Sequence, residues 1–232
     1  MSEWVKVTAS DGFVLSAYVA RPQDDPKGAI VVIQEIFGVN KSIQAVADSY
    51  ASDGFLAIAP AIMDRIEPGL NLGYGEADLK KAFSLYPKLN PDDSLKDVAA
   101  AFKYAREIID SVGVLGFCYG GLVSWVAAVR GNNEAIEPAC TVCYYPGGIG
   151  KFAAEEPSCP VMIHFGGADD HIGNDQVDAV RNAHGKHPGE VEIFVYEGAP
   201  HAFANPDRPS YKAEAAKLAR ERSLKFLNTH IA

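Results

Sequence analysis

The chain has 232 residues, of which 48% are hydrophobic, and a formal net charge of -9. This length and apolar content suit one enzyme-sized domain with a large core, and the acidic charge argues against a nucleic-acid or anionic-membrane surface. The start of the chain lacks the basic end and apolar run of a signal peptide, and no apolar stretch approaches the ~20 residues that span a bilayer, so we expect a cytoplasmic protein.

The first quarter of the chain predicts a sheet that begins with a hairpin. The turn signal Ser10-Asp11-Gly12 separates two short strands and favours an antiparallel pair at a sheet edge. Residues 29–35 form a nearly continuous apolar run, which is typical of a parallel strand buried on both faces. The expected elements are strands over 5–8, 13–20 and 29–35, a helix between Asn40 as N-cap and Gly54, and a strand over 55–60.

Residues 61–91 interrupt this alternation. Glycines and prolines surround a short helical piece that carries Leu79, Phe83 and Tyr86, and this predicts an excursion that covers the substrate. A helix capped by one of residues 92–94 follows.

Residues 116–121, Gly-Phe-Cys-Tyr-Gly-Gly, have the glycine frame of a nucleophile elbow, with Cys118 where such elbows usually carry serine. An apolar strand over 110–117 precedes Cys118, and a helix over 122–129 follows it, as an elbow requires. The alternative is a buried cysteine in an ordinary turn between a strand and a helix. The motif therefore nominates a thiol nucleophile.

The second half of the chain continues the alternation. Strands are expected over 140–145, 161–165 and 191–196, and a last helix over 210–227. The whole pattern predicts an α/β fold in one domain over residues 1–232, with a mostly parallel twisted sheet and helices on both faces. In such sheets the chemistry lies on the loops at the carboxyl ends of the strands.

A catalytic thiol needs a base, and the base needs an orienting acid. Asp169 and Asp170 follow the strand over 161–165, and His201 follows the strand over 191–196, so both groups come after the nucleophile in the order acid, then histidine. Spacing alone does not separate the two aspartates, although Ile172 would anchor a loop that presents Asp169.

The other histidines have simpler interpretations. His164 lies within a strand and is expected to be a hydrogen-bonded core histidine, and His184 and His187 lie in a polar stretch that we expect to be solvated. His171 is the one serious competitor of His201, because it stands beside the candidate acids.

Glu35 ends an apolar strand and is well placed to meet Cys118. An anionic neighbour disfavours a thiolate, so this glutamate is expected to control the ionisation of the thiol. The backbone amides of Ile36 and Tyr119 are the expected oxyanion hole.

The remaining cysteines predict no metal or redox site. Cys140 and Cys143 have a CxxC spelling, but in a strand residues three apart point to opposite faces. Four irregularly spaced cysteines suit reduced thiols, and we expect no cofactor and no metal.

Together these motifs resemble the dienelactone hydrolase (carboxymethylenebutenolidase) family over nearly the whole chain. The resemblance rests on Gln-Glu-Ile-Phe-Gly-Val-Asn at 34–40, the elbow at 116–121, Gly-Gly-Ala-Asp at 166–169 and His-Ala-Phe-Ala at 201–204. It implies a single-domain α/β-hydrolase with a Cys118, His201 and Asp169 triad, in which Glu35 holds the thiol and then takes its proton.

The chain departs from the family where the resemblance implies two arginines for a substrate carboxylate. No arginine lies between Arg65 and Arg106, and Asn205 follows the motif at 201–204. Possible substitutes are Lys80, Lys81 and Arg208, although lysine lacks the flat fork of arginine. Phe83 and Tyr86 fall where the family has aromatic pocket residues; helical spacing also allows them simply to pack the excursion.

The expected function is hydrolysis of an ester or lactone through a thioester acyl-enzyme, with a small-molecule substrate and neither a nucleic acid nor a membrane as partner. A monomer or a small homo-oligomer is expected. The alternative is a non-catalytic or redox-responsive binding protein with Cys118 as a sensor thiol. Because a binding scaffold needs no nucleophile, base, acid and glutamate together, the hydrolase is favoured.

Overall fold

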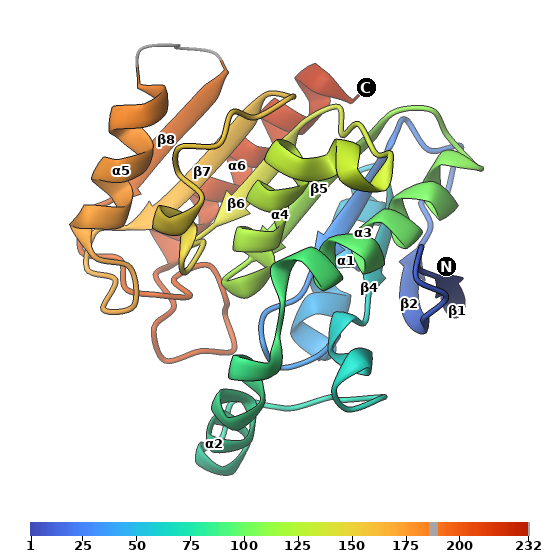
Figure 1. Ribbon diagram of the computed structural model, residues 1–232, viewed down its shortest axis with the longest axis horizontal. Coiled ribbons are helices and arrows are strands. Elements are labelled where there is room, and N and C mark those ends of the chain that lie inside the picture. The colour runs from blue at the N-terminus through green and yellow to red at the C-terminus, as the bar shows by residue number, and fades with distance from the viewer. Residues whose placement is uncertain (186–189, 232) are drawn as a thin grey trace.

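The computed structural model describes residues 1–185 and 190–231 and has one eight-stranded sheet in the order β1-β2-β4-β3-β5-β6-β7-β8 (Figure 1). β2 pairs antiparallel with β1 and with β4, and all other neighbours are parallel. The predicted edge hairpin and mostly parallel sheet are therefore confirmed. The strands are β1 (Ser2–Thr8), β2 (Val14–Ala20), β3 (Ala29–Ile33), β4 (Leu56–Pro60), β5 (Val112–Phe117), β6 (Thr141–Tyr144), β7 (Val161–Gly166) and β8 (Val191–Tyr196).

Helices cover both faces of the sheet. In Figure 1, α3, α4 and α5 lie in front of it, and α1 and α6 lie behind. The helices are α1 (Lys41–Ser52), α2 (Glu76–Leu85), α3 (Pro91–Arg106), α4 (Tyr119–Arg130), α5 (Asn174–His184) and α6 (Ala213–His230), and the short 3-10 turns are η1 (Ile62–Arg65), η2 (Tyr86–Lys88), η3 (Gly131–Glu134) and η4 (Ile149–Lys151). No helix in the described ranges combines the length and apolar character that crossing a bilayer requires.

Two details of the helices differ from expectation. The cap of α3 is Asn90, whose side chain accepts a hydrogen bond from the amide of Asp92, rather than one of residues 92–94. Pro91 explains the earlier start, because proline is favoured at the first helical position, where its missing N–H costs nothing. The polar stretch after residue 174 forms α5, a helix that the sequence pattern did not predict.

The segment between β4 and α3 docks onto the loop after β3. Gly38, at φ 85°, forms a bridge with Asn71, and a Cβ there would lie 1.8 Å from the carbonyl oxygen of Leu70. The amide of Leu72 donates to the carbonyl of Phe37 at 2.9 Å. This docking brings Tyr74 to the carboxyl end of β3, and α2 projects below the sheet in Figure 1.

Candidate active site

Cys118 occupies a sharp turn between β5 and α4. Its backbone has φ 55° and ψ -117°, a conformation that non-glycine residues rarely adopt. The turn needs glycine at two flanking positions: a Cβ on Gly116 would lie 2.1 Å from the carbonyl oxygen of Gly120, and one on Gly120 would lie 2.4 Å from that of Gln34. The sequence thus builds the tight turn of an elbow and leaves Cys118 partly exposed.

His201 and Asp169 meet although they lie 32 residues apart in the chain. Nδ1 of His201 is 2.8 Å from Oδ2 of Asp169, and the Asp169 side chain is fully buried. The other oxygen, Oδ1, accepts hydrogen bonds from the amides of His171 and Ile172. Asp170, in contrast, has an 81% exposed side chain, and Asp169 is the aspartate that bonds to His201.

The surroundings of His201 favour its charged form. Burial opposes the charge, but the neighbouring Cys118 sulfur, when ionised, and the bond to Asp169 outweigh it and raise the pKa of His201 to about 10. Tyr145, fully buried and at φ 36°, packs its ring edge-on against His201 with centroids 5.1 Å apart. These contacts favour a protonated imidazole at this position.

The remaining described histidines lie in different surroundings. His164 is a core histidine as expected, with Nδ1 2.9 Å from the Tyr196 hydroxyl and Nε2 2.9 Å from that of Ser223. His171 is half exposed, and its ring stands edge-on to that of His201 at 4.9 Å. His184 was expected to be solvated, which is wrong: it ends α5, is 2% exposed and bonds to the carbonyl of Ala153 at 2.8 Å. His187 lies outside the described residues.

Glu35 is 2% exposed and is held by two hydrogen-bond donors. Its Oε2 accepts from Nδ2 of Asn205 at 3.0 Å and from the hydroxyl of Tyr74 at 3.2 Å. Burial raises the pKa of Glu35, and the positive charges of Arg208 and His201 oppose this. Within the described ranges no group donates a hydrogen bond to Oε1, so this oxygen keeps its capacity to accept one.

The two amides expected to form the oxyanion hole are near the elbow. Tyr119 is the first residue of α4, and amides in a first helical turn have no acceptor within the helix. Ile36 follows Glu35 in the loop after β3, and its amide makes no hydrogen bond within the described chain. Both N–H groups are thus free of local acceptors.

Cys118 and His201 line one cavity of about 210 Å³. Phe83 and Tyr86 line it too, on the expected aromatic side. Arg208 also faces this cavity and makes no side-chain ion pair or hydrogen bond with the described residues, whereas Lys81 pairs with Glu67. Of the three candidate substitutes for the family arginines, Arg208 alone lines the cavity.

Cys140 and Cys143 lie away from the candidate site. Cys140 and Cys143 are fully buried at β6, and burial raises the pKa of both thiols, which keeps them protonated. Neither lies in the cavity of Cys118.

Three groups at the site escaped the sequence interpretation: Tyr74 and Asn205 at Glu35, and Tyr145 at His201. Tyr74 lies in the irregular segment before α2, where no periodic pattern identifies contacts. For Asn205 a signal existed, since it directly follows the motif at 201–204.

Comparisons with known proteins identify the family of this chain. The model of the dienelactone hydrolase family matches residues 15–231. The carboxymethylenebutenolidase of Pseudomonas putida is 30% identical over 98% of this chain and 96% of its own length. A crystal structure from Klebsiella pneumoniae subsp. pneumoniae, provisionally described as a dienelactone hydrolase, has a TM-score of 0.82 and 28% identity and covers 98% of this chain and 99% of that one. A dienelactone hydrolase-like promiscuous phosphotriesterase, P91, from metagenomic libraries has a TM-score of 0.79 over 100% of this chain and 99% of its own; at 18% identity this likeness concerns the fold alone.

Proposed function

Because this chain belongs to the dienelactone hydrolase family and is a hydrolase of that type, we propose that it cleaves an ester or lactone with Cys118 as its nucleophile. The observation that carries the proposal is the shared cavity: the elbow thiol and the His201 ring, whose far nitrogen bonds to the buried Asp169, face one small space. A binding protein would have no need of this combination.

The reaction begins with transfer of the thiol proton from Cys118 to Nε2 of His201. His201 stabilises the thiolate by its positive charge, and Asp169 fixes the ring so that Nε2 is directed away from the carboxylate. Glu35 is the second group able to accept the thiol proton, because burial raises its pKa and Oε1 is available. The sulfur then attacks the substrate carbonyl.

Two transfers complete the cycle. The carbonyl oxygen takes up negative charge and is stabilised by the amides of Ile36 and Tyr119, each donor contributing up to about 3 kcal/mol. The bond to the leaving oxygen breaks, and that oxygen takes a proton from Nε2 of His201. Water then gives a proton back to His201, attacks the thioester, and releases the acid and the thiolate.

Arg208 is the group that selects the substrate. It is half-buried and lies over the rings of Phe37 and Tyr74. Its guanidinium makes no ion pair or hydrogen bond with another side chain within the described chain. A planar guanidinium binds a carboxylate with two parallel hydrogen bonds. We therefore expect a substrate that carries a carboxylate near the scissile bond.

Intact mass after brief incubation with an activated aryl ester tests the nucleophile. The wild type is expected to gain one acyl group, and Cys118→Ala is expected to gain none and to lose turnover while keeping its fold. Cys159→Ala, which changes another partly exposed thiol, is the control and should acylate normally. Turnover by Cys118→Ala at the wild-type rate would refute the proposal.

Comparing a carboxylated lactone with a neutral aryl ester tests the substrate class. Arg208→Gln should lower kcat/KM for the carboxylated lactone by about 10- to 100-fold, the loss expected for one charge-assisted contact, and leave the neutral ester within about threefold. Lys80→Gln is the control and should change neither substrate. Equal losses on both substrates would assign Arg208 to the fold rather than to recognition.

A further inference from the structure

A second and larger cavity lies between α1, α6 and the sheet. Its volume is about 520 Å³, which falls in the range of small-molecule sites. Glu35 lies at its boundary, but neither Cys118 nor His201 lines it. The thiol and the imidazole of the proposed reaction therefore face a different space.

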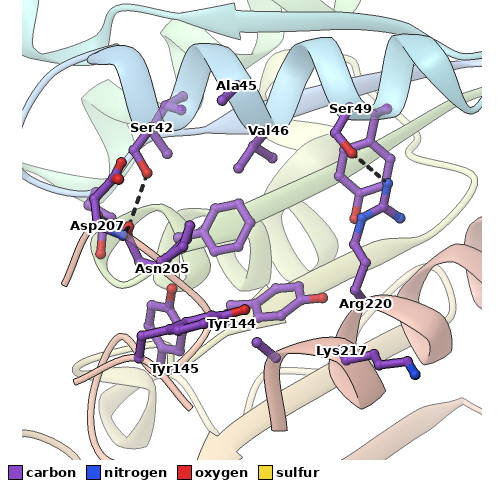
Figure 2. A pocket seen from close by; sticks show the side chains of 18 residues that line it. Ser42, Ala45, Val46, Ser49, Tyr144, Tyr145, Asn205, Asp207, Lys217 and Arg220 are labelled. Carbon is purple, nitrogen blue, oxygen red and sulfur yellow. Dashed lines mark hydrogen bonds between the residues drawn. The ribbon is translucent and has the colours of Figure 1, made fainter. Parts of the chain in front are cut away.

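The cavity is polar at its two ends and apolar between them. Figure 2 shows Ser42 and Asn205 at one end, Arg220 and Lys217 at the other, and Val46 between them. The first end is closed by hydrogen bonds, since the Ser42 hydroxyl donates to Oδ1 of Asn205 at 3.1 Å. The unused hydrogen-bonding capacity lies at the second end.

Two donors at that second end lack acceptors. The hydroxyl of Tyr50 is buried and has no hydrogen-bond partner among the described residues, and the same holds for Nη1 of Arg220. Tyr50 is 1% exposed, and burial raises its pKa to about 12, so the hydroxyl is a permanent donor. Buried donors are almost always satisfied in proteins, so an unpaired pair in the wall of a cavity points to an acceptor that arrives from outside.

The charges around the cavity select an anion at this end. Arg220 stacks on the Tyr50 ring with Cζ 3.8 Å from its centroid, and its Nη2 bonds to Asp53, which offsets part of its charge. Lys217 adds a positive charge and forms no ion pair within the described ranges. The carboxylates of Glu35 and Asp207 lie toward the Asn205 end and repel an anion from it.

We propose that this cavity is a second binding site, which takes a small carboxylate with an apolar body. The carboxylate accepts hydrogen bonds from Tyr50 and Arg220, and the apolar body packs against Val46 and the ring of Phe117. The site goes beyond the proposed hydrolysis, and its occupancy can be measured without any turnover.

Isothermal titration calorimetry of the whole protein with 4-phenylbutyrate tests the site, with 4-phenylbutanol as the uncharged probe. The carboxylate is expected to bind, and the alcohol to bind at least about tenfold more weakly. Tyr50→Phe keeps the ring on which Arg220 stacks and removes one donor, so a loss of about five- to tenfold in affinity is expected. Arg220→Lys keeps a positive charge for Asp53 but removes the planar guanidinium. A similar loss of affinity is expected.

Arg208→Gln separates the two cavities, because Arg208 lines only the cavity of Cys118. This variant removes any binding of the probe carboxylate at Arg208, and the binding that depends on Tyr50 and Arg220 should remain. The proposal is overturned if about 10 mM 4-phenylbutyrate, enough to detect a weak site, shows no binding. It is also overturned if the alcohol and the carboxylate bind equally. A third contrary outcome is that Arg208→Gln weakens binding while Tyr50→Phe and Arg220→Lys do not. Thermal unfolding of each variant shows whether a loss of affinity is a loss of fold.

Discussion

The Glu35 carboxylate is almost fully buried, and its hydrogen bonds explain how it remains ionisable there. Tyr74 and Asn205 both donate to Oε2, and the Tyr74 hydroxyl itself accepts from Asn40 at 3.1 Å and from Asn205 at 2.8 Å. Burial raises the pKa of Glu35, and these donors lower it by stabilising the anion. Two side chains thus bond to Glu35 directly, and Asn40 supports one of them through the Tyr74 hydroxyl.

Tyr74→Phe should therefore make Glu35 harder to ionise. Loss of the hydrogen bond raises the pKa of Glu35, so the acid limb of the pH profile of kcat/KM is expected to move to higher pH. At a fixed pH on that limb, loss of a charged hydrogen bond of about 1.5 kcal/mol should lower kcat/KM roughly tenfold. Tyr104→Phe, whose hydroxyl contacts Arg21 far from the site, should leave the profile unchanged. A uniform loss at every pH would mean that Tyr74 acts only through packing.

The backbone of Cys118 is strained, because a non-glycine residue there has a positive φ. Relative to Cys118→Ala, Cys118→Gly should raise the free energy of unfolding by about 1 to 2 kcal/mol, because glycine adopts positive φ without a Cβ clash. Urea denaturation measures this difference. Ala135→Gly, also at positive φ but exposed, should stabilise similarly, whereas Ala215→Gly within α6 should cost about 1 kcal/mol. If Cys118→Gly destabilises, the elbow is not strained.

At the scale of elements, His164 joins β7 to β8 and α6. It bonds to Tyr196 in β8 and to Ser223 in α6, and burial together with the charge of Arg222 lowers its pKa to about 3. The unfolded chain binds a proton near pH 6.5, whereas the fold excludes it down to about pH 3. The fold therefore loses stability as the pH falls through this window.

Substitution of His164 should flatten this dependence. Between pH 7 and pH 4.5 the wild type is expected to lose about 2 to 3 kcal/mol more than His164→Gln, since each pH unit below the unfolded pKa costs about 1.4 kcal/mol. Urea denaturation at both pH values gives the difference. His171→Gln, which changes a half-exposed ring, should keep the wild-type dependence. Parallel losses in wild type and His164→Gln would show that His164 is protonated within the fold.

The sequence predicted the elements whose apolar pattern is strong. The parallel strands are buried on both faces and appear as continuous apolar runs, such as residues 29–33. α5 was missed because it buries only Val177, Val180 and His184, and one of those three reads as polar. A periodic apolar pattern identifies a helix only when the helix buries enough apolar side chains, and this helix buries few.

The site was predictable as far as it follows chain order. Nucleophile, acid and histidine each lie beyond the carboxyl end of a strand, Asp169 after β7 and His201 after β8, so topology brings them to one edge of the sheet. The contacts of Glu35 are different, because Asn205 approaches from 170 residues away and Tyr74 arrives through the docking of Asn71 on Gly38. Long-range contacts between irregular segments leave no periodic trace in a sequence.

At the scale of the whole molecule, one arginine connects three distant segments. Arg65 at the end of η1 binds Asp97 in α3 through two hydrogen bonds of 2.8 Å, and binds Asp11 in the β1–β2 turn at 2.9 Å. The Asp97 side chain is fully buried, and the Arg65 side chain is 19% exposed. The edge hairpin, the start of the segment between β4 and α3, and α3 itself therefore share one ionic centre.

Arg65→Met should destabilise the protein by about 3 kcal/mol, because it leaves Asp97 buried without its counter-ion. For a chain of this size that corresponds to a fall in Tm of roughly 6 to 12 °C, measurable by calorimetry. Adding Asp97→Asn should restore part of the loss, since the double variant has no unpaired buried charge. Lys81→Met breaks the Lys81–Glu67 pair of the same excursion, whose side chains are 45% and 42% exposed, and should cost less than about 1 kcal/mol. Equal falls in Tm for Arg65→Met and Lys81→Met would mean that burial of Asp97 adds nothing and that the three segments are held together by their apolar contacts alone.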